Sequence, residues 1–189
     1  MTFVILALGY LLGSLPTAYI VGRITRDRDI RELGDGNMGA QNAYRQLGAG
    51  AGITVFLIDV AKGAIAILLA QRVGLSEFAV LSTGVAAVIG HNFPFFLGWR
   101  GGRGESTTIG VLLVLVTQPL LILGTLALVT LIFTKNVIIA SAVLFAPLWL
   151  ICLWAGVQPA LIVYSVAMPC LVAFTHYLRA RQRAPRPVG

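Results

Sequence analysis

The sequence predicts an all-α protein that crosses a membrane about seven times, and three observations support this prediction. Of the 189 residues, 58% are hydrophobic and only 11% are charged, whereas a soluble domain carries about 25% charged residues. The mean hydropathy is +0.89. Apolar runs close to the roughly 20 residues that a helix needs to cross a bilayer recur along the chain, and arginines and lysines lie at their ends.

The expected membrane-spanning helices follow from these runs in order. Five runs are long enough to cross the hydrocarbon layer, at residues 2–22, 50–70, 76–97, 137–155 and 158–178. The remaining stretch, 106–134, is ambiguous. It forms either two short helices, 106–118 and 120–134, hinged near Gln118 and Pro119, or one long kinked span.

The positions of the basic residues favour seven crossings. With seven, twelve of the fourteen lysines and arginines fall on one side of the membrane, only Arg72 falls on the other, and Lys62 lies within a span. With six, they divide seven to six. Because positive charge concentrates on the cytoplasmic side, the N-terminus is expected outside and the C-terminus in the cytoplasm. The prediction is a single transmembrane domain, 1–178, with cytoplasmic loops 23–49 and 98–105 and a basic cytoplasmic tail, 179–189.

Two glycine-rich loops on the cytoplasmic side suggest a phosphate site. Residues 34–42 contain three glycines and two asparagines, and backbone N–H groups in such loops can cradle an anion. Arg45 follows, and arginine suits bidentate phosphate contact. The second loop places Arg103 among glycines just before an expected helix start near Thr107, where N–H groups also bind phosphate. Each loop alone is also compatible with an ordinary turn or a basic membrane anchor, but two on one face favour a site for one or two phosphates.

Three ionisable residues stand out within the apolar runs. Asp59 and Lys62 are three residues apart, so they share one helix face. Charges at membrane depth are costly, and they mark either a functional site or a structural ion pair. His91 ends another apolar run. It is either a hydrogen-bonded structural residue or a phosphate contact and general base.

Composition also argues against some functions. The net charge is +7, but the basic residues lie at the ends of apolar runs and form no face mixed with aromatic residues, so nucleic-acid binding is not expected. The two cysteines show no metal-ligand spacing. No zinc motif and no P-loop is visible in the sequence either, so no metal and no cofactor are predicted.

Several ordered motifs resemble a known family. They are Gly13-Ser14-Leu15-Pro16, Gly36-Asn37-Met38-Gly39-Ala40-Gln41-Asn42, Asp59-Val60-Ala61-Lys62-Gly63 and Gly90-His91-Asn92-Phe93-Pro94, the last continuing to Gly101-Gly102-Arg103-Gly104. Together they are similar to the motifs of the bacterial acyl-phosphate:glycerol-3-phosphate acyltransferases, the PlsY family. The match is close over roughly residues 10–110 and rests on hydropathy elsewhere.

The resemblance implies a seven-helix protein of the bacterial inner membrane with a cytoplasmic active site. Such enzymes transfer a fatty acyl group from acyl phosphate to the sn-1 hydroxyl of glycerol-3-phosphate, which gives lysophosphatidic acid for phospholipid synthesis. The expected partners are these two substrates and membrane lipids. The expected catalytic residues are His91, Arg45 and Arg103. The expected substrate-binding residues are Asp35, Gly36, Asn37, Gly39, Asn42, Lys62, Gly101, Gly102, Gly104, Thr107, Lys135, Ser141 and His176.

The sequence also departs from the family pattern. The family has Ser where Asp35 stands and Lys where Arg103 stands, and Glu105 replaces a small residue. Ile138 and Ala140 stand in place of serines, and Arg179 in place of Asn. Two alternatives to an active acyltransferase therefore stay open. One is a catalytically impaired member that binds phospholipid or phosphorylated metabolites. The other is a small-anion transporter, although no clear inverted repeat supports it.

Overall fold

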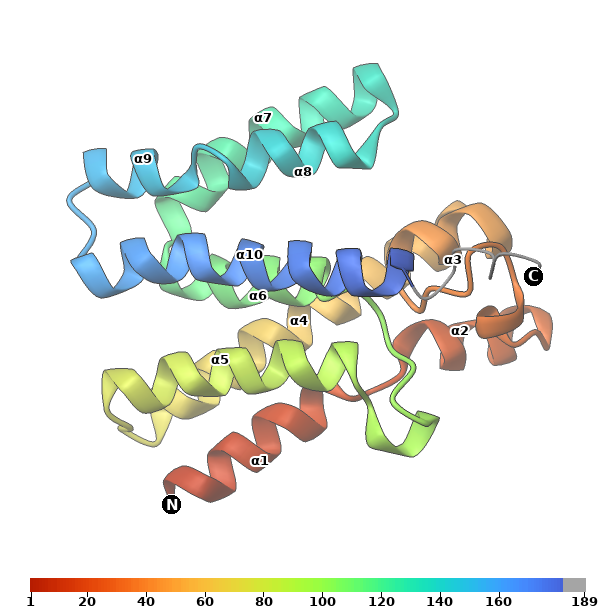
Figure 1. Ribbon diagram of the computed structural model, residues 1–189, viewed down its shortest axis with the longest axis horizontal. Coiled ribbons are helices and arrows are strands. Elements are labelled where there is room, and N and C mark those ends of the chain that lie inside the picture. Colours follow the sequence, from red (N-terminus) through yellow and green to blue (C-terminus); the bar gives the residue numbers. More distant parts are fainter. Residues whose placement is uncertain (182–189) are drawn as a thin grey trace, which may run out of the picture.

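The computed structural model is a bundle of helices and describes residues 1–181 (Figure 1). The elements are α1 (Thr2–Gly13), α2 (Thr17–Arg26), the 3-10 turn η1 (Ile30–Glu32), α3 (Ala40–Leu47), α4 (Ala49–Arg72), α5 (Glu77–Asn92), the 3-10 turn η2 (Phe95–Leu97), α6 (Glu105–Leu115), α7 (Thr117–Thr134), α8 (Val137–Phe145), α9 (Leu148–Trp154) and α10 (Pro159–Arg181). The predicted tail lies outside the described residues from residue 182 onward.

Six helical segments of the described chain are long and apolar enough to cross a membrane, and α6 is a shorter apolar helix. Three of the six are interrupted, at Ser14–Pro16 between α1 and α2, at Phe93–Pro94 between α5 and η2, and at Ala146–Pro147 between α8 and α9. Each interruption contains a proline, which cannot donate the helical hydrogen bond. The all-helical membrane fold is thus confirmed, and the seventh predicted crossing corresponds to the short helix α6.

The ambiguous stretch 106–134 forms two helices. The backbone breaks at Val116, with φ −135° and ψ 54°, and α7 begins at the next residue. The expected hinge near Gln118 and Pro119 is therefore wrong by about two residues. Pro119 lies in the first turn of α7, where the missing N–H group costs nothing because first-turn N–H groups have no partner within the helix.

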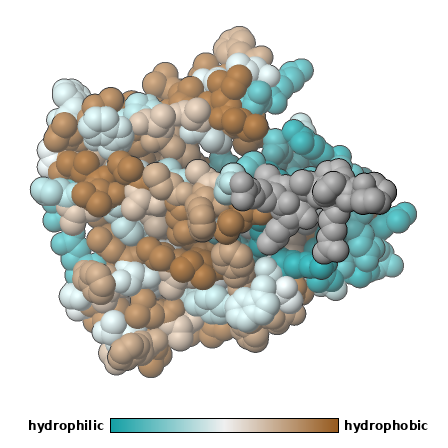
Figure 2. Space-filling model, in the orientation of Figure 1, coloured by the Kyte–Doolittle hydropathy of each residue, from teal (hydrophilic) through white to brown (hydrophobic). Residues whose placement is uncertain are grey.

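The long helices run back and forth between two ends of the molecule. Met1 lies at one end and the last turn of α10 at the other (Figure 1), as an odd number of crossings requires. The α2–α3 region, the α5–α6 loop and the end of α10 gather at the second end, which we call the polar end. Hydrophilic side chains are concentrated there, whereas apolar ones cover much of the visible bundle (Figure 2). The count of seven crossings and the orientation in the membrane stay predictions.

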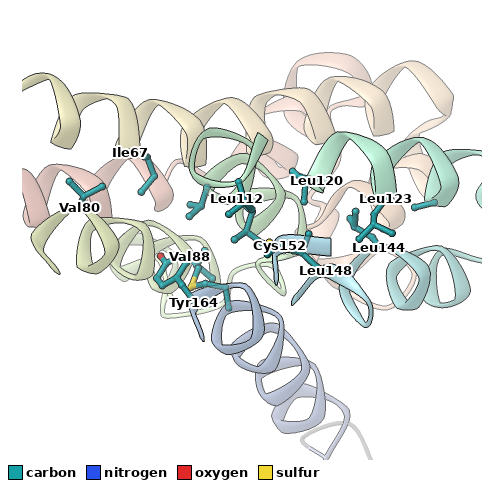
Figure 3. Packing of buried hydrophobic residues seen from close by; sticks show 14 of the residues in the cluster. Ile67, Val80, Val88, Leu112, Leu120, Leu123, Leu144, Leu148, Cys152 and Tyr164 are labelled. Atoms are coloured by element: carbon teal, nitrogen blue, oxygen red, sulfur yellow. The ribbon is translucent and has the colours of Figure 1, made fainter. Parts of the chain in front are cut away.

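The core joins α4, α5, α6 and the C-terminal helices. Ile67, Leu112, Leu148 and Tyr164 are among the buried residues that pack together there (Figure 3). Helices α4 and α6 approach closely because glycines face the partner backbone: a Cβ atom at Gly63 would collide with the Thr107 carbonyl. Small residues at such contacts let membrane helices pack tightly. This packing sets the position of the first turn of α6.

The connection from α2 to α4 is more ordered than the predicted loop 23–49, since it includes η1 and α3. Asp29 is buried and accepts hydrogen bonds from Arg31 Nη2 at 2.6 Å and from the Arg31 backbone N–H at 3.0 Å. The guanidinium groups of Arg23 and Arg31 lie 5.5 and 5.1 Å from the ring centre of Tyr19. Arg23 Nη2 also lies 3.7 Å from Asp29 Oδ2, so Asp29 holds two arginines of this segment together.

The buried carboxylate of Asp29 predicts a pH-dependent contribution to stability. The Arg31 guanidinium holds the pKa of Asp29 below its usual value. The folded state therefore gains stability above the ordinary carboxyl pKa and loses it as the pH falls through the lowered value. At neutral pH, Asp29→Asn should cost about 1–3 kcal/mol, as expected for hydrogen bonds to a charged group.

Thermal unfolding of the detergent-solubilised protein between pH 7 and pH 3 would check this. The difference between wild type and Asp29→Asn should shrink as the pH falls. Asp27→Asn is the matched control, because the side chain of Asp27 is 96% exposed, and it should unfold like the wild type at every pH. An equal deficit of Asp29→Asn at all pH values would contradict the prediction.

Candidate active site

The centre of the candidate site is a buried ion pair on α4. Lys62 Nζ lies 2.8 Å from Asp59 Oδ1, and the two side chains are only 3% and 1% exposed. Lys62 Nζ also donates to the Leu15 carbonyl at 3.1 Å, and Thr17 Oγ1 donates to Asp59 Oδ1 at 2.9 Å. Leu15 lies in the break between α1 and α2, where its carbonyl accepts from the Thr17 N–H group at 2.9 Å and has a second lone pair available for Lys62. The pairing of Asp59 with Lys62 is thus established.

His91 joins this pair from the C-terminal turn of α5. Its Nδ1 lies 3.7 Å from Asp59 Oδ1, and the side chain is buried. The opposite edge of the ring, at Nε2, lies against Gly102, where any added Cβ atom would collide with it. A glycine is therefore required at position 102 for the α5–α6 loop to pack on the histidine.

Backbone hydrogen bonds dock this loop onto the end of α5. The Gly102 N–H group donates to the His91 carbonyl at 3.0 Å, and the Gly101 N–H group donates to the Asn92 carbonyl at 3.1 Å. We expected the N–H groups of this loop to bind phosphate. The groups of Gly101 and Gly102 instead satisfy α5 carbonyls that have no helical donor, so any anion must rely on later N–H groups and on Arg103.

A small pocket lies between these elements. It collects residues from the α1–α2 break, from the loop before α3, from α4 and α5, and from the α5–α6 loop. Its lining consists of Ser14, Leu15, Pro16, Thr17, Met38, Lys62, His91, Pro94 and Gly102. The predicted site residues Lys62, His91 and Gly102 therefore meet around one pocket, although they are far apart in the sequence.

The two glycine-rich loops meet at the polar end of the bundle. Asp35 Oδ2 accepts a hydrogen bond from Arg103 Nη2 at 2.8 Å, and Asp35 Oδ1 accepts one from the Asn37 N–H group at 3.1 Å. An acidic residue beside a phosphate loop is tolerable when an arginine pairs with it, and Arg103 meets this need. The loops are thus in contact, as expected of parts of one site.

Asn42 organises the first loop from within. Its Nδ2 group lies 3.4, 3.1 and 3.0 Å from the carbonyl oxygens of Ile30, Leu33 and Asn37. Gly36 has a φ of +60°, which suits glycine in this turn, and Gly39 caps the start of α3. The amide of Asn42 therefore holds the loop in shape, and its predicted contact with substrate stays untested.

Buried polar atoms cluster around the first turn of α6. Thr107 Oγ1, Thr108 Oγ1 and both side-chain polar atoms of Asn92 are buried without a hydrogen-bond partner in the described protein, as is Arg103 Nε. The Asn92 amide lies against Gly104, which adopts a φ of +86° before the helix. Buried polar atoms are normally satisfied, and a helix start attracts anions. This region is therefore suited to an anionic group.

Sequence reasoning missed Asn92 as a site residue. Asn92 lies in the motif with His91 and Pro94. Only the fold shows that its side chain is completely buried beside the loop. The position of this asparagine at the end of an apolar run was the one sequence feature that could have indicated its role.

The C-terminal helices complete the surroundings of Arg103. Ser141 Oγ on α8 donates to a Glu105 carboxylate oxygen at the start of α6, and Thr175 Oγ1 on α10 donates to the Arg103 carbonyl at 3.1 Å. His176 is exposed on α10, and the charges of Arg103 and Asp35 act on it. Ser141 and His176 are thus near the predicted site.

Two predicted residues lie on the surface of the same end. Arg45 is exposed on α3, and Lys135 is exposed at the turn between α7 and α8, where its φ is +52°. Their roles as phosphate ligands stay predictions.

The apolar helical bundle is typical of an integral membrane protein. The buried charged pocket at its polar end gives this protein a preformed polar site. The family model for glycerol-3-phosphate acyltransferase matches residues 3–184. The chain belongs to this family.

Similar proteins cover nearly the whole chain. A protein named glycerol-3-phosphate acyltransferase 4 from Dehalococcoides mccartyi is 52% identical over 96% of this chain and 98% of its own length. A glycerol-3-phosphate acyltransferase from Prochlorococcus marinus is 40% identical over 93% of this chain and 91% of its own length.

Two solved structures match the fold. Crystal structures of PlsY, an integral membrane glycerol-3-phosphate acyltransferase, match with TM-scores of 0.84 for the glycerol-3-phosphate form and 0.82 for the lysophosphatidic acid form. They are 28% and 27% identical and cover 96% of this chain and 90% of the solved chain.

Proposed function

We propose that the protein transfers a fatty acyl group from acyl phosphate to the sn-1 hydroxyl of glycerol-3-phosphate. The observation that carries this proposal is the 52% identity with a glycerol-3-phosphate acyltransferase over 98% of that protein's length. The polar site supports it, because the Arg103 loop and the first turn of α6 offer positive charge and polar atoms to an anion. Nothing in the structure favours the impaired member or the anion transporter.

The reaction forms one ester bond and breaks one mixed-anhydride bond. The sn-1 oxygen attacks the carbonyl carbon of acyl phosphate, and the bond from that carbon to the phosphate oxygen breaks. Phosphate leaves with the electron pair, and the hydroxyl proton passes to a base. The products are lysophosphatidic acid and inorganic phosphate, so no metal or other co-reactant is needed to balance the step.

The chain's own residues act mainly by binding and positioning. We assign one phosphate to Arg103 and the first turn of α6, and the other to Arg45 beside the Asn37 loop. Holding both reactants in place can supply about 7–11 kcal/mol of the barrier. The buried ammonium group of Lys62 is fixed by Asp59 and Leu15, so it contributes a preorganised positive charge at the pocket.

The surroundings of His91 favour a substrate phosphate as the proton acceptor. One ring nitrogen faces Asp59 and the other faces Gly102, so both are directed into the protein. We therefore assign His91 to shaping the pocket with Asp59, in place of the general-base role considered from the sequence.

The proposed function also includes a location and an orientation of the protein in the cell. A bacterial inner membrane with the N-terminus outside puts the polar end in the cytoplasm, where the basic residues concentrate. Glycerol-3-phosphate then reaches the site from water, and acyl phosphate reaches it from the inner leaflet.

Arg45→Ala tests the phosphate assignment. Loss of a charge-assisted contact should lower kcat/KM for glycerol-3-phosphate about 10- to 100-fold. The assay supplies palmitoyl phosphate and labelled glycerol-3-phosphate to the purified protein in lipid and measures labelled lysophosphatidic acid. Arg72→Ala is the control, because this exposed arginine ends α4 at the opposite end of the bundle.

The outcomes separate the alternatives. Full activity of Arg45→Ala would remove Arg45 from the site while leaving the acyltransferase assignment intact. A folded wild-type protein that binds glycerol-3-phosphate but forms no lysophosphatidic acid would overturn the proposed function and favour the binding protein.

A further inference from the structure

The inner face of α10 contacts the α5–α6 loop at two points one helical turn apart. Thr175 Oγ1 donates to the Arg103 carbonyl at 3.1 Å. Four residues later, Arg179 Nη2 donates to the Asn92 carbonyl at 2.6 Å and to the Trp99 carbonyl at 3.3 Å. Residues four apart share a helix face, so α10 reaches both ends of the segment 99–103 with a single face.

Arg179 is well suited to hold the point where the loop leaves α5. The Asn92 carbonyl ends α5, and a helix C-terminus attracts positive charge. The same carbonyl accepts the Gly101 N–H group at 3.1 Å, so it links α10 to the loop. The guanidinium carbon lies 5.6 Å from the ring centre of Phe93, a distance at which a cation and an aromatic ring attract each other.

The second carbonyl that Arg179 binds belongs to a strained residue. Trp99 has a φ of +63°, a conformation that costs free energy in residues other than glycine and persists only when the surroundings hold it. Arg179 supplies one such constraint through the Trp99 carbonyl. The strained turn directs the chain back so that Gly101 and Gly102 dock on α5 and Arg103 follows.

We propose that Arg179, assisted by Thr175, is a positioning residue that clamps the segment 99–103 so that Arg103 is in place for substrate phosphate. This inference rests on the proposed function, but it assigns to α10 a role that requires no contact with substrate. Both backbone carbonyls accept from the same nitrogen, Nη2, so the clamp depends on the reach and planar geometry of the guanidinium group as well as on its charge.

Amide hydrogen exchange of the whole protein in lipid tests the clamp directly. In Arg179→Gln, the amides of Gly101 and Gly102 should exchange about tenfold faster than in the wild type, because the hydrogen bonds to the Asn92 and Trp99 carbonyls are lost. Arg179→Lys keeps the charge but lacks the planar guanidinium group that reaches both carbonyls, so its exchange rates at Gly101 and Gly102 should fall between those of Arg179→Gln and the wild type. Arg26→Gln is the control, since it removes an exposed arginine from α2 at the same end of the bundle.

The acyl-transfer assay gives a second readout. The KM for glycerol-3-phosphate should rise about tenfold in Arg179→Gln, stay at the wild-type value in Arg26→Gln, and recover in part in Arg179→Lys. Thr175→Val, which has nearly the same shape, should shift exchange and KM in the same direction by a smaller factor. It serves as the second variant if Arg179→Gln does not fold.

Each outcome decides the proposal. Unchanged exchange at Gly101 and Gly102 would overturn it, whatever the activity. Faster exchange throughout α4 and α6 would show a general structural role and also overturn it, as would faster loop exchange with an unaltered KM. A wild-type protein without acyl transfer would refute the proposed function, whereas the exchange result would still decide whether the clamp exists.

Discussion

Replacing Lys62 by methionine is expected to destabilise the protein by about 3–5 kcal/mol, because it leaves a buried carboxylate without its cation. Asp59 Oδ1 would keep only the Thr17 hydroxyl at 2.9 Å and the distant His91 ring, and Asp59 Oδ2 is already buried without a partner among the described residues. The hydrogen bond from Lys62 to the Leu15 carbonyl would be lost as well, which loosens the break between α1 and α2.

A double variant distinguishes the cost of an unpaired buried charge from the effect of the changed side-chain shape. Asp59→Asn combined with Lys62→Met removes both charges, and it should recover much of the lost stability because paired removal of buried charges is often close to neutral. Chemical unfolding in detergent measures all three proteins, with Lys135→Met as the control for removal of an exposed lysine. A single variant as stable as the wild type would show that the pair adds nothing to folding.

Gly102→Ala is expected to lower kcat/KM about 100-fold or more while the bundle stays folded. An added Cβ would collide with the ring of His91 at Nε2, so either the loop lifts from α5 or the ring turns away from Asp59. A displacement of about 1 Å at a positioning element can cost about 10²-fold in rate. Arg103 follows Gly102 directly and moves with it.

The matched control is Gly50→Ala, since a Cβ at Gly50 in α4 meets open space. Acyl transfer and thermal unfolding should be measured on both variants. Wild-type activity in Gly102→Ala would mean that the docking of the loop on His91 has no part in the reaction.

The sequence predicts the parts of this site that depend on local spacing. The three-residue separation of Asp59 and Lys62 predicts a shared helix face, and the ion pair confirms it. The two glycine-rich loops are predicted to act together, and the Asp35–Arg103 contact brings them into one place. These predictions succeed because helix geometry and charge pairing act over short distances in the chain.

Other features depend on contacts that no local pattern records. The partners of Lys62 and Asp59 in the α1–α2 break, Leu15 and Thr17, are visible only once α4 packs beside that break. Helix α3 was missed because only eight residues, half of them polar, carry little hydrophobic signal, and its stability comes from packing against α4. The link from Arg179 to Asn92 crosses 87 residues of sequence.

The ion pair between Arg103 and Asp35 determines how easily the two glycine-rich loops can separate. The side chains of Arg103 and Asp35 are 22% and 40% exposed, and a pair so open to water contributes about 0–1 kcal/mol. Even at 1 kcal/mol, this contact alone would be broken in about one molecule in six. An arriving phosphate therefore meets an arginine that is frequently released by thermal motion, and added salt should increase that fraction by screening the pair. The contact with Asp35 holds Arg103 at the site between turnovers. A doubly charged phosphate can then replace Asp35 as the partner of Arg103.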